Sequence, residues 1–185
     1  MSESQHRFFI ALLPSVEVQD YANQVKQQFV EVYNSRAAQN SPPHITLQPP
    51  FLWQKENLPP LEKSLQEFAQ NQFPIPITFS GFGAFSPRVI YLNVSKTPEL
   101  LQIKQELEIH LQNNLGIVHK EPKNRQFTPH LTVVSRGLSK ENFSLAWQEY
   151  KNKELYLKCT IAQLTLLIYN GKNWEIKKEF SLLNN

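Results

Sequence analysis

Cysteine is almost absent from this chain, which contains Cys159 and no other. A single cysteine excludes a disulfide within the chain and every zinc site that needs several cysteines. Long apolar runs are also missing, because the run near the N-terminus stops at Pro14 and is too short to cross a bilayer. No basic segment precedes that run and no small-residue cleavage site follows it, so we expect a cytoplasmic protein with no membrane partner.

A strong net charge is missing too. The chain has 19 Lys and Arg against 16 Asp and Glu, a formal charge of +3. This excess suits an anionic substrate but is too small to predict a nucleic-acid coat. Hydrophobic residues make up 41% of the 185 positions, which is enough for a core. With no low-complexity linker, residues 1–185 are predicted to form one domain or two small lobes that share a core.

Hydrophobic periodicity predicts alternating helices and strands. Apolar residues recurring every three or four positions favour helices, and short apolar runs between turn residues favour strands. The predicted helices cover residues 15–34, 59–71, 100–115 and 139–150. The predicted strands cover residues 7–13, 44–48, 75–85, 89–95, 130–134, 155–169 and 174–182. This succession predicts an α+β fold with substantial antiparallel pairing.

One short pattern occurs twice. Residues 43–47 are Pro-His-Ile-Thr-Leu, and residues 129–133 are Pro-His-Leu-Thr-Val. Each copy opens a predicted strand after a helix and a polar loop. A chain built from two related halves would show such a repeat.

The spacing within the pattern has a structural consequence. Residues two apart in a strand share a face, so His44 lies beside Thr46 and His130 beside Thr132, while the aliphatic residues between them point to the core. Two imidazoles with ordinary pKa values near 6.5 let one act as base and the other as acid around pH 7. The threonine hydroxyls can donate to phosphoryl oxygens. The pattern therefore predicts phosphoester chemistry that needs no metal and no cofactor.

Two other interpretations are open at this point. A single H-x-T in a strand is typical of an ordinary polar face, although two copies in matched contexts favour function. Histidines are also common metal ligands. Neither copy has an adjacent Asp, Glu or Cys, however, and two histidines alone leave most catalytic metals short of ligands.

These residues resemble those of the 2H phosphoesterase superfamily, which is defined by two H-x-(T/S)-x motifs, and of its 2′-5′ RNA ligase/cyclic phosphodiesterase (LigT-like) branch. The stretch HRFFIALLPS is similar to the opening strand of that branch, GFGAFSPRVIYLNV to its central hairpin, and FTPHLTVVSR to its signature F-x-P-H-x-T. The resemblance covers residues 6–136. It implies one domain of two intertwined lobes over residues 1–185, with two antiparallel β-sheets related by a pseudo-two-fold, helices on the outside and the active-site cleft between the lobes.

The resemblance also implies an activity. His44 and His130 would be the acid/base pair, and Thr46 and Thr132 would hold the phosphate. Such enzymes open 2′,3′-cyclic phosphates to 2′-phosphates, or make and break 2′-5′ linkages, without a metal. We therefore expect a monomeric phosphodiesterase or 2′-5′ RNA ligase-like enzyme that acts on RNA or a nucleotide, with either histidine as the acid. The alternative is an RNA- or nucleotide-binding module of the same fold without turnover.

Four more residues are predicted to contact the substrate. Phe127 and Arg125 could contact a base and a phosphate, or Phe127 could plug the entrance of the strand. Phe51, behind two prolines, could form a wall of the cleft or cap the core. Ligase-like members commonly carry Arg five residues after the second histidine, where this chain has Ser135. Arg136 follows, and it could line the cleft from the histidine face of an ideal strand or mark a bulge.

Overall fold

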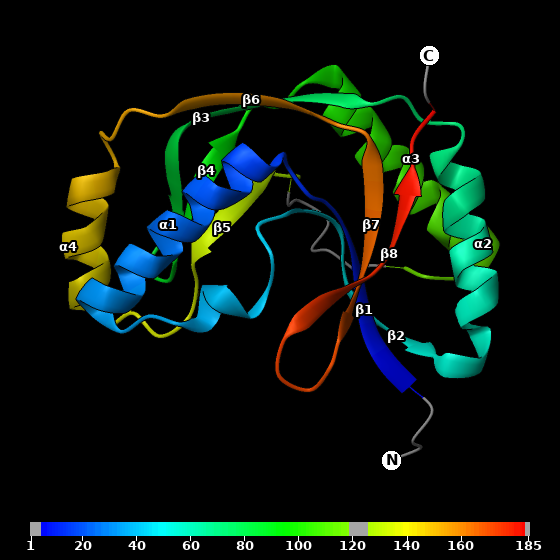
Figure 1. Cartoon of the computed structure of the whole chain (residues 1–185), viewed down its shortest axis with the longest axis horizontal. Helices are drawn as coiled ribbons and strands as arrows, with labels where there is room; N and C mark the ends of the chain where they lie inside the picture. The colour runs from blue at the N-terminus through cyan, green and yellow to red at the C-terminus, as the bar shows by residue number, and fades with distance from the viewer. Residues whose placement is uncertain (1–4, 119–125, 184–185) are drawn as a thin grey trace.

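Four α-helices and eight strands alternate along residues 5–118 and 126–183, the part of the chain that this computed structural model describes (Figure 1). The strands are β1 (Gln5–Leu12), β2 (Ile45–Gln54), β3 (Ile75–Phe85), β4 (Val89–Val94), β5 (His130–Val134), β6 (Tyr156–Ile161), β7 (Gln163–Tyr169) and β8 (Trp174–Ser181). The helices are α1 (Val16–Tyr33), α2 (Leu58–Ala69), α3 (Pro98–Leu115) and α4 (Lys140–Tyr150). No helix in this part is both long and apolar enough to span a membrane.

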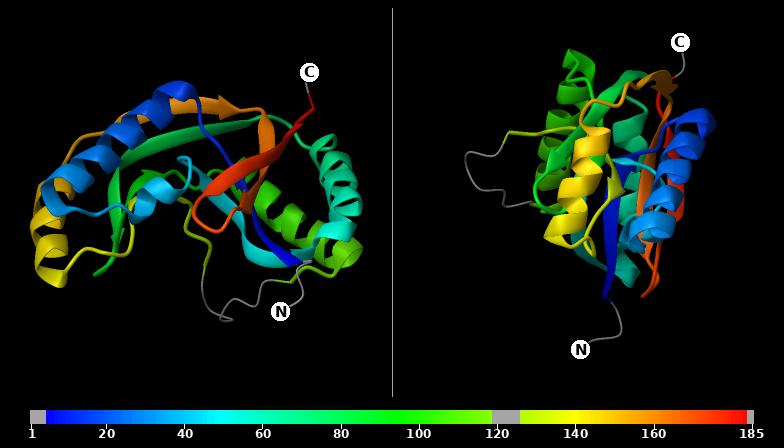
Figure 2. Two further views of the ribbon diagram at one scale, coloured as in Figure 1. Left: turned by 60° about the horizontal axis from the view of Figure 1, so that its bottom comes forward. Right: turned by 90° about the vertical axis from the view of Figure 1, so that its left-hand side faces the viewer.

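The strands form one curled antiparallel sheet in the order β6-β3-β4-β5-β2-β1-β7-β8. Helices α1 and α4 lie at one end of the curl, and α2 and α3 lie at the other (Figure 2). The two four-stranded halves meet where β5 pairs with β2, at the residue pair Ile45 and Leu131. The predicted α+β fold is confirmed, and its two expected sheets are joined edge to edge at this pair.

The two halves repeat one arrangement. In each, a strand, a helix and a motif strand follow one another, as β1-α1-β2 and as β4-α3-β5. The motif strands lie next to each other in the middle of the sheet, and each pairs with the first strand of its own unit. The helices are exchanged, since α1 packs on β5 and α3 packs on β2. Each half therefore supplies the helix that lies behind the other half's motif strand.

The ends of the helices follow their sequence signals. The Ser139 side chain accepts a hydrogen bond from the Asn142 backbone N–H at the start of α4, and Thr97 does the same at the start of α3. Gly116 ends α3 with a φ of 65°, a left-handed conformation that costs glycine little. The residues that directly follow α3, 116–118, therefore leave the helix in a direction that Gly116 sets.

Two predicted strands differ in the structure. The predicted strand 155–169 is two strands, because β6 pairs with β3 in one half of the sheet while β7 pairs with β1 in the other. The prolines do not end β2, which continues through Pro49 and Pro50 to Gln54. The β1–β2 register shifts beside these prolines, and such a bulge accommodates residues that have no N–H to donate.

Candidate active site

The pairing of the two motif strands places the four motif side chains on one face of the sheet, where its two halves meet. Because Ile45 lies opposite Leu131 in an antiparallel ladder, Thr46 is the neighbour of His130, and His44 is the neighbour of Thr132. All four side chains leave the sheet on the face opposite the buried aliphatic pair. The two histidines are thus diagonal neighbours on one face of the sheet, within reach of a common ligand. Each histidine sits across from the threonine of the other motif.

Both histidines are held by the same backbone contact. The His44 Nδ1 lies 2.7 Å from the carbonyl oxygen of Pro42, and the His130 Nδ1 lies 2.7 Å from the carbonyl oxygen of Thr128. A carbonyl can only accept, so in each bond the Nδ1–H donates. The Nε2 atom of each ring is therefore the one that can exchange a proton with a ligand.

Aromatic rings fix the orientation of both imidazoles. The Phe9 ring centroid lies 4.8 Å from that of His44. On the other side, Phe85 meets His130 edge to face at 5.0 Å and 89°, and Tyr91 lies 5.2 Å from it. One aromatic neighbour at His44, two at His130, and a hydrogen bond at each Nδ1 leave the rings little freedom, as proton transfer at a defined atom requires.

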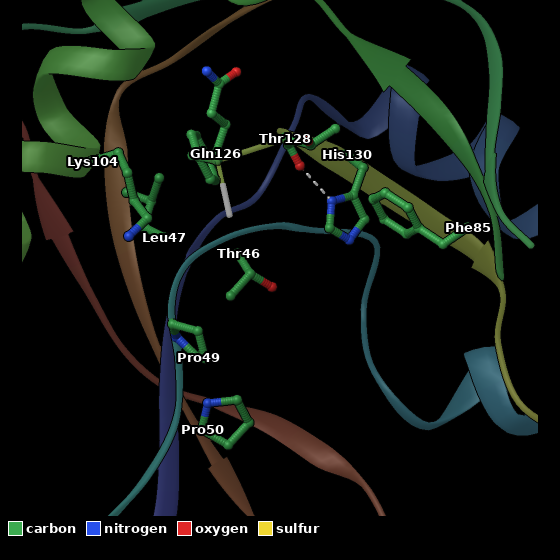
Figure 3. A pocket seen from close by; sticks show the side chains of 10 residues that line it. Thr46, Leu47, Pro49, Pro50, Phe85, Lys104, Gln126, Thr128 and His130 are labelled. Atoms are coloured by element: carbon green, nitrogen blue, oxygen red, sulfur yellow. Dashed lines mark hydrogen bonds between the residues drawn. The ribbon is translucent and has the colours of Figure 1, made fainter. Parts of the chain in front are cut away.

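A cavity of about 420 Å³ opens beside Thr46 and His130. Figure 3 shows both side chains directed toward it, with the His130–Thr128 hydrogen bond at its rim. The other residues that line it come from β2, β3, α3 and the segment before β5: Leu47, Pro49, Pro50, Phe85, Lys104, Gln126, Phe127 and Thr128. The walls are thus mainly apolar rings and prolines, with one amide and one ammonium group.

Burial sets the protonation state of His44. Loss of solvent lowers the pKa of His44 to about 4, the hydrogen bond to Pro42 opposes this, and the nearby charges of Lys26 and His130 lower it further. Lys26 is itself buried, and its Nζ donates to the Ser41 carbonyl at 3.0 Å. At neutral pH the His44 imidazole is therefore uncharged, with a lone pair on Nε2.

This shift predicts a pH-dependent loss of stability. Between an unfolded pKa of 6.5 and a folded pKa of about 4, the unfolded chain binds a proton at His44 that the folded chain does not. The free energy of unfolding should therefore fall as the pH drops through this window, by about 3 kcal/mol in total from this group. Urea denaturation at a series of pH values should show this slope in the wild type. His44→Gln should lack it, and equal slopes in both proteins would contradict the assignment.

Gly83 makes room for the ring that supports His130. A Cβ at this position would lie 2.3 Å from Cε2 of Tyr91, whose ring is buried and contacts His130. Gly83→Ala should therefore lower the free energy of unfolding by about 1–3 kcal/mol through overpacking, and lower turnover by displacing His130. In a Tyr91→Ala background the same substitution should cost almost nothing. Thermal melts and initial rates of the four proteins test this, and additive effects would refute it.

The other predicted contact residues lie at different distances from the cavity. Phe127 lines it, with the Lys104 Nζ 5.4 Å from its ring centroid. Phe51 is not part of the lining. It packs on the main core, 6.2 Å from the Phe8 ring. Arg136 is exposed, and it lies beyond the end of β5. Arg125 lies outside the described residues.

The sequence patterns missed several residues around the site. Phe9 alternates with core residues along β1, so a period of two could have placed it on the cleft face. Lys26 lies on the buried face of α1, and its spacing of four from buried apolar positions was the available signal. No local sequence pattern indicated Lys104 or Gln126, because only the tertiary fold brings these two residues to the cavity.

No group of three or more His, Cys, Asp or Glu side chains within residues 5–118 and 126–183 is arranged to hold a metal ion. Metal independence stays a prediction that a chelator can test.

A family model and several known proteins are similar to this chain over most of its length. The family model of the 2′-5′ RNA ligase superfamily matches residues 14–173. A Bacillus cytotoxicus protein named "putative phosphoesterase" is 30% identical over 176 residues, which cover 94% of this chain and 95% of that protein. A Bacillus thuringiensis protein with the same name is 31% identical over 177 residues, with the same coverage.

Two solved structures share the fold. Escherichia coli LigT in complex with 3′-AMP superimposes with a TM-score of 0.68 at 20% identity, covering 97% of this chain and 99% of LigT. A Thermus thermophilus protein superimposes with a TM-score of 0.65 at 17% identity, covering 95% of this chain and 97% of its own. The curled sheet and its helices are therefore an arrangement already seen in crystals.

Proposed function

The chain belongs to the 2′-5′ RNA ligase superfamily, and we propose that it is a metal-independent phosphodiesterase that opens 2′,3′-cyclic phosphates to 2′-phosphates or makes and breaks 2′-5′ linkages. The family supports phosphoesterase or 2′-5′ ligase activity in general. The observation that carries the finer proposal is the pair of matched histidines. Each donates its Nδ1–H to a carbonyl at 2.7 Å, so in each ring Nε2 is the atom that can take up or release a proton.

The proposed step assigns the two histidines different roles. His44 is the base, because its pKa of about 4 keeps it neutral. Its Nε2 takes a proton from water, whose oxygen attacks phosphorus. The bond from phosphorus to the 3′ oxygen breaks, and that oxygen takes a proton from the Nε2 of protonated His130, which yields a 2′-phosphate. The Thr46 and Thr132 hydroxyls donate to the phosphoryl oxygens as their charge grows. In ligation, a 5′-hydroxyl takes the place of water. In cleavage of a 2′-5′ linkage, which is the reverse step, the two histidines exchange the roles of acid and base.

The cavity beside Thr46 and His130 supports a nucleoside as the group attached to the phosphate. Its volume of about 420 Å³ is in the range of small-molecule sites. The Phe127 ring and the prolines offer apolar faces to a base or ribose, and the Gln126 amide offers a donor and an acceptor. Escherichia coli LigT, which shares the fold, has been crystallised with 3′-AMP and with NADP+, and this supports a nucleotide as the ligand of this chain as well.

Hydrolysis of nucleoside 2′,3′-cyclic monophosphates in excess EDTA tests the proposal. We expect the 2′-phosphate as the product, identified by chromatography against 2′- and 3′-phosphate standards. A chelator-sensitive rate that a divalent metal restores would contradict metal independence. Saturable binding without turnover, across cyclic phosphates and 2′-5′ oligonucleotides, would instead identify a nucleotide-binding module of the same fold.

A further inference from the structure

An aromatic patch with an arginine lies on β1, β7 and β8, and its residues are not among those that line the cavity. Trp174 of β8 and Tyr169 of β7 are paired in the sheet, and their ring centroids are 5.2 Å apart. The Arg7 guanidinium of β1 lies 5.8 Å from both ring centroids. These three residues, which come from three neighbouring strands, are called the Arg7 patch below.

One shared neighbour connects the Arg7 patch to the candidate active site. The Phe9 ring lies 4.8 Å from His44 and 4.7 Å from Trp174. Phe9 belongs to a small apolar cluster with Ala11 and Leu167, against which Trp174 packs, and this cluster is separate from the main core. The patch therefore begins one ring beyond His44, on the sheet face that carries the motif side chains.

The Arg7 patch is open to a ligand. Trp174 and Tyr169 are half-buried and Arg7 is exposed. No carboxylate in the described part of the chain forms an ion pair with Arg7. A guanidinium held near two rings, without an acidic partner, presents a positive charge beside flat apolar faces. Proteins bind unpaired bases and the neighbouring phosphates of single-stranded RNA with this combination.

We propose that the Arg7 patch is a subsite for a second nucleobase, so that the substrate carries a nucleoside on each side of the reacting phosphate. This inference rests on the proposed function for the position of the phosphate, between His44 and His130. One nucleoside enters the cavity beside Thr46, and the base of the other stacks on Trp174 or Tyr169 with Arg7 near its phosphate. The substrate class is then a 2′-5′-linked oligonucleotide, in preference to a mononucleotide cyclic phosphate.

Tryptophan fluorescence gives a binding readout that does not depend on turnover. The chain has three tryptophans, so Trp53→Phe with Trp147→Phe leaves Trp174 as the sole emitter. In this variant with His130→Ala added to stop turnover, 2′-5′-linked adenylyl-adenosine should quench the emission saturably. Adenosine 2′,3′-cyclic phosphate should quench it far less at saturation. Equal quenching by both ligands, or none by the dinucleotide, would overturn the proposal.

Affinity measurements distinguish stacking of a base on the Arg7 patch from attraction of the ligand by the net charge of the protein. Arg7→Ala and Trp174→Leu should each weaken binding of the dinucleotide about ten-fold, and weaken binding of the cyclic mononucleotide by a much smaller factor. Lys63→Ala, which removes one charge from an exposed position on α2, is the control for net charge. If both variants lost affinity equally for the two ligands, the subsite would be wrong, and hydrolysis of the cyclic phosphate would still support the proposed function. If they lost affinity only for the dinucleotide, and the wild type hydrolysed neither ligand, the subsite would stand and the proposed function would be wrong.

Discussion

His44→Ala and His130→Ala should each lower kcat for cyclic phosphate hydrolysis by about 10²–10⁴-fold, the range that one general acid or base contributes. The geometry explains why neither imidazole can replace the other. Each ring is tied by its own backbone carbonyl at 2.7 Å and packed against its own aromatic neighbours. Stopped assays with purified protein in EDTA measure the effect. Circular dichroism and thermal melts show whether each variant is folded.

The two histidines should also act as a unit. Because one gives a proton while the other takes one, the double variant should be only slightly slower than either single variant. His6→Ala is the matched control, since it removes an imidazole from β1 outside the cavity lining. Near wild-type turnover in either single variant, or fully multiplicative losses in the double variant, would refute a paired acid/base mechanism.

The acid limb of the pH–rate profile offers a further check on the roles. If His44 is the base, kcat/KM should hold until the pH approaches its pKa of about 4 and fall below it.

The repeated motif predicted which side chains of the two strands face the core before the fold was known. Two H-x-T strands with aliphatic residues between determine which side chains face the core, and Ile45 and Leu131 are indeed fully buried. The motifs alone do not predict that the two strands pair with each other in one sheet. They do not predict the exchange of helices between the halves either, because the apolar stripes of α1 and α3 are equally compatible with packing on either motif strand.

Other parts of the site depend on contacts between distant strands. The run from 155 to 169 has one continuous strand signal, yet its two parts pair in opposite halves of the sheet. Tyr169 therefore reaches Arg7 only through tertiary pairing. The burial of single positions is no easier to predict. Val32, three residues after the buried Phe29 in the first helix, is 69% exposed, while Lys26 is buried. Burial is decided by which surface packs on the helix, and local periodicity carries only part of that information.

Leu131→Ala is expected to lower the free energy of unfolding by about 2–5 kcal/mol and to lower turnover in the protein that stays folded. Leu131 pairs with Leu92 on one side and with Ile45 on the other, so it lies where the two half-sheets meet and directly between His130 and Thr132. A cavity there removes the support that sets the distance between the two motif strands. Urea denaturation at pH 7, with rates measured well below the melting temperature, separates the two effects.

Two variants on β2, the strand that pairs with β5, serve as controls for Leu131→Ala. Ile45→Val, which removes one methyl group at the same junction, should cost about 0.5–1.5 kcal/mol. Leu52→Ala on the same strand should cost less than about 0.5 kcal/mol, because its side chain is 59% exposed. If Leu131→Ala destabilised the fold but left kcat unchanged, the two histidines would be positioned by their own loops and not by the strand pair. A loss of kcat that tracks the loss of stability across the three variants would show that the junction of the half-sheets positions both histidine rings.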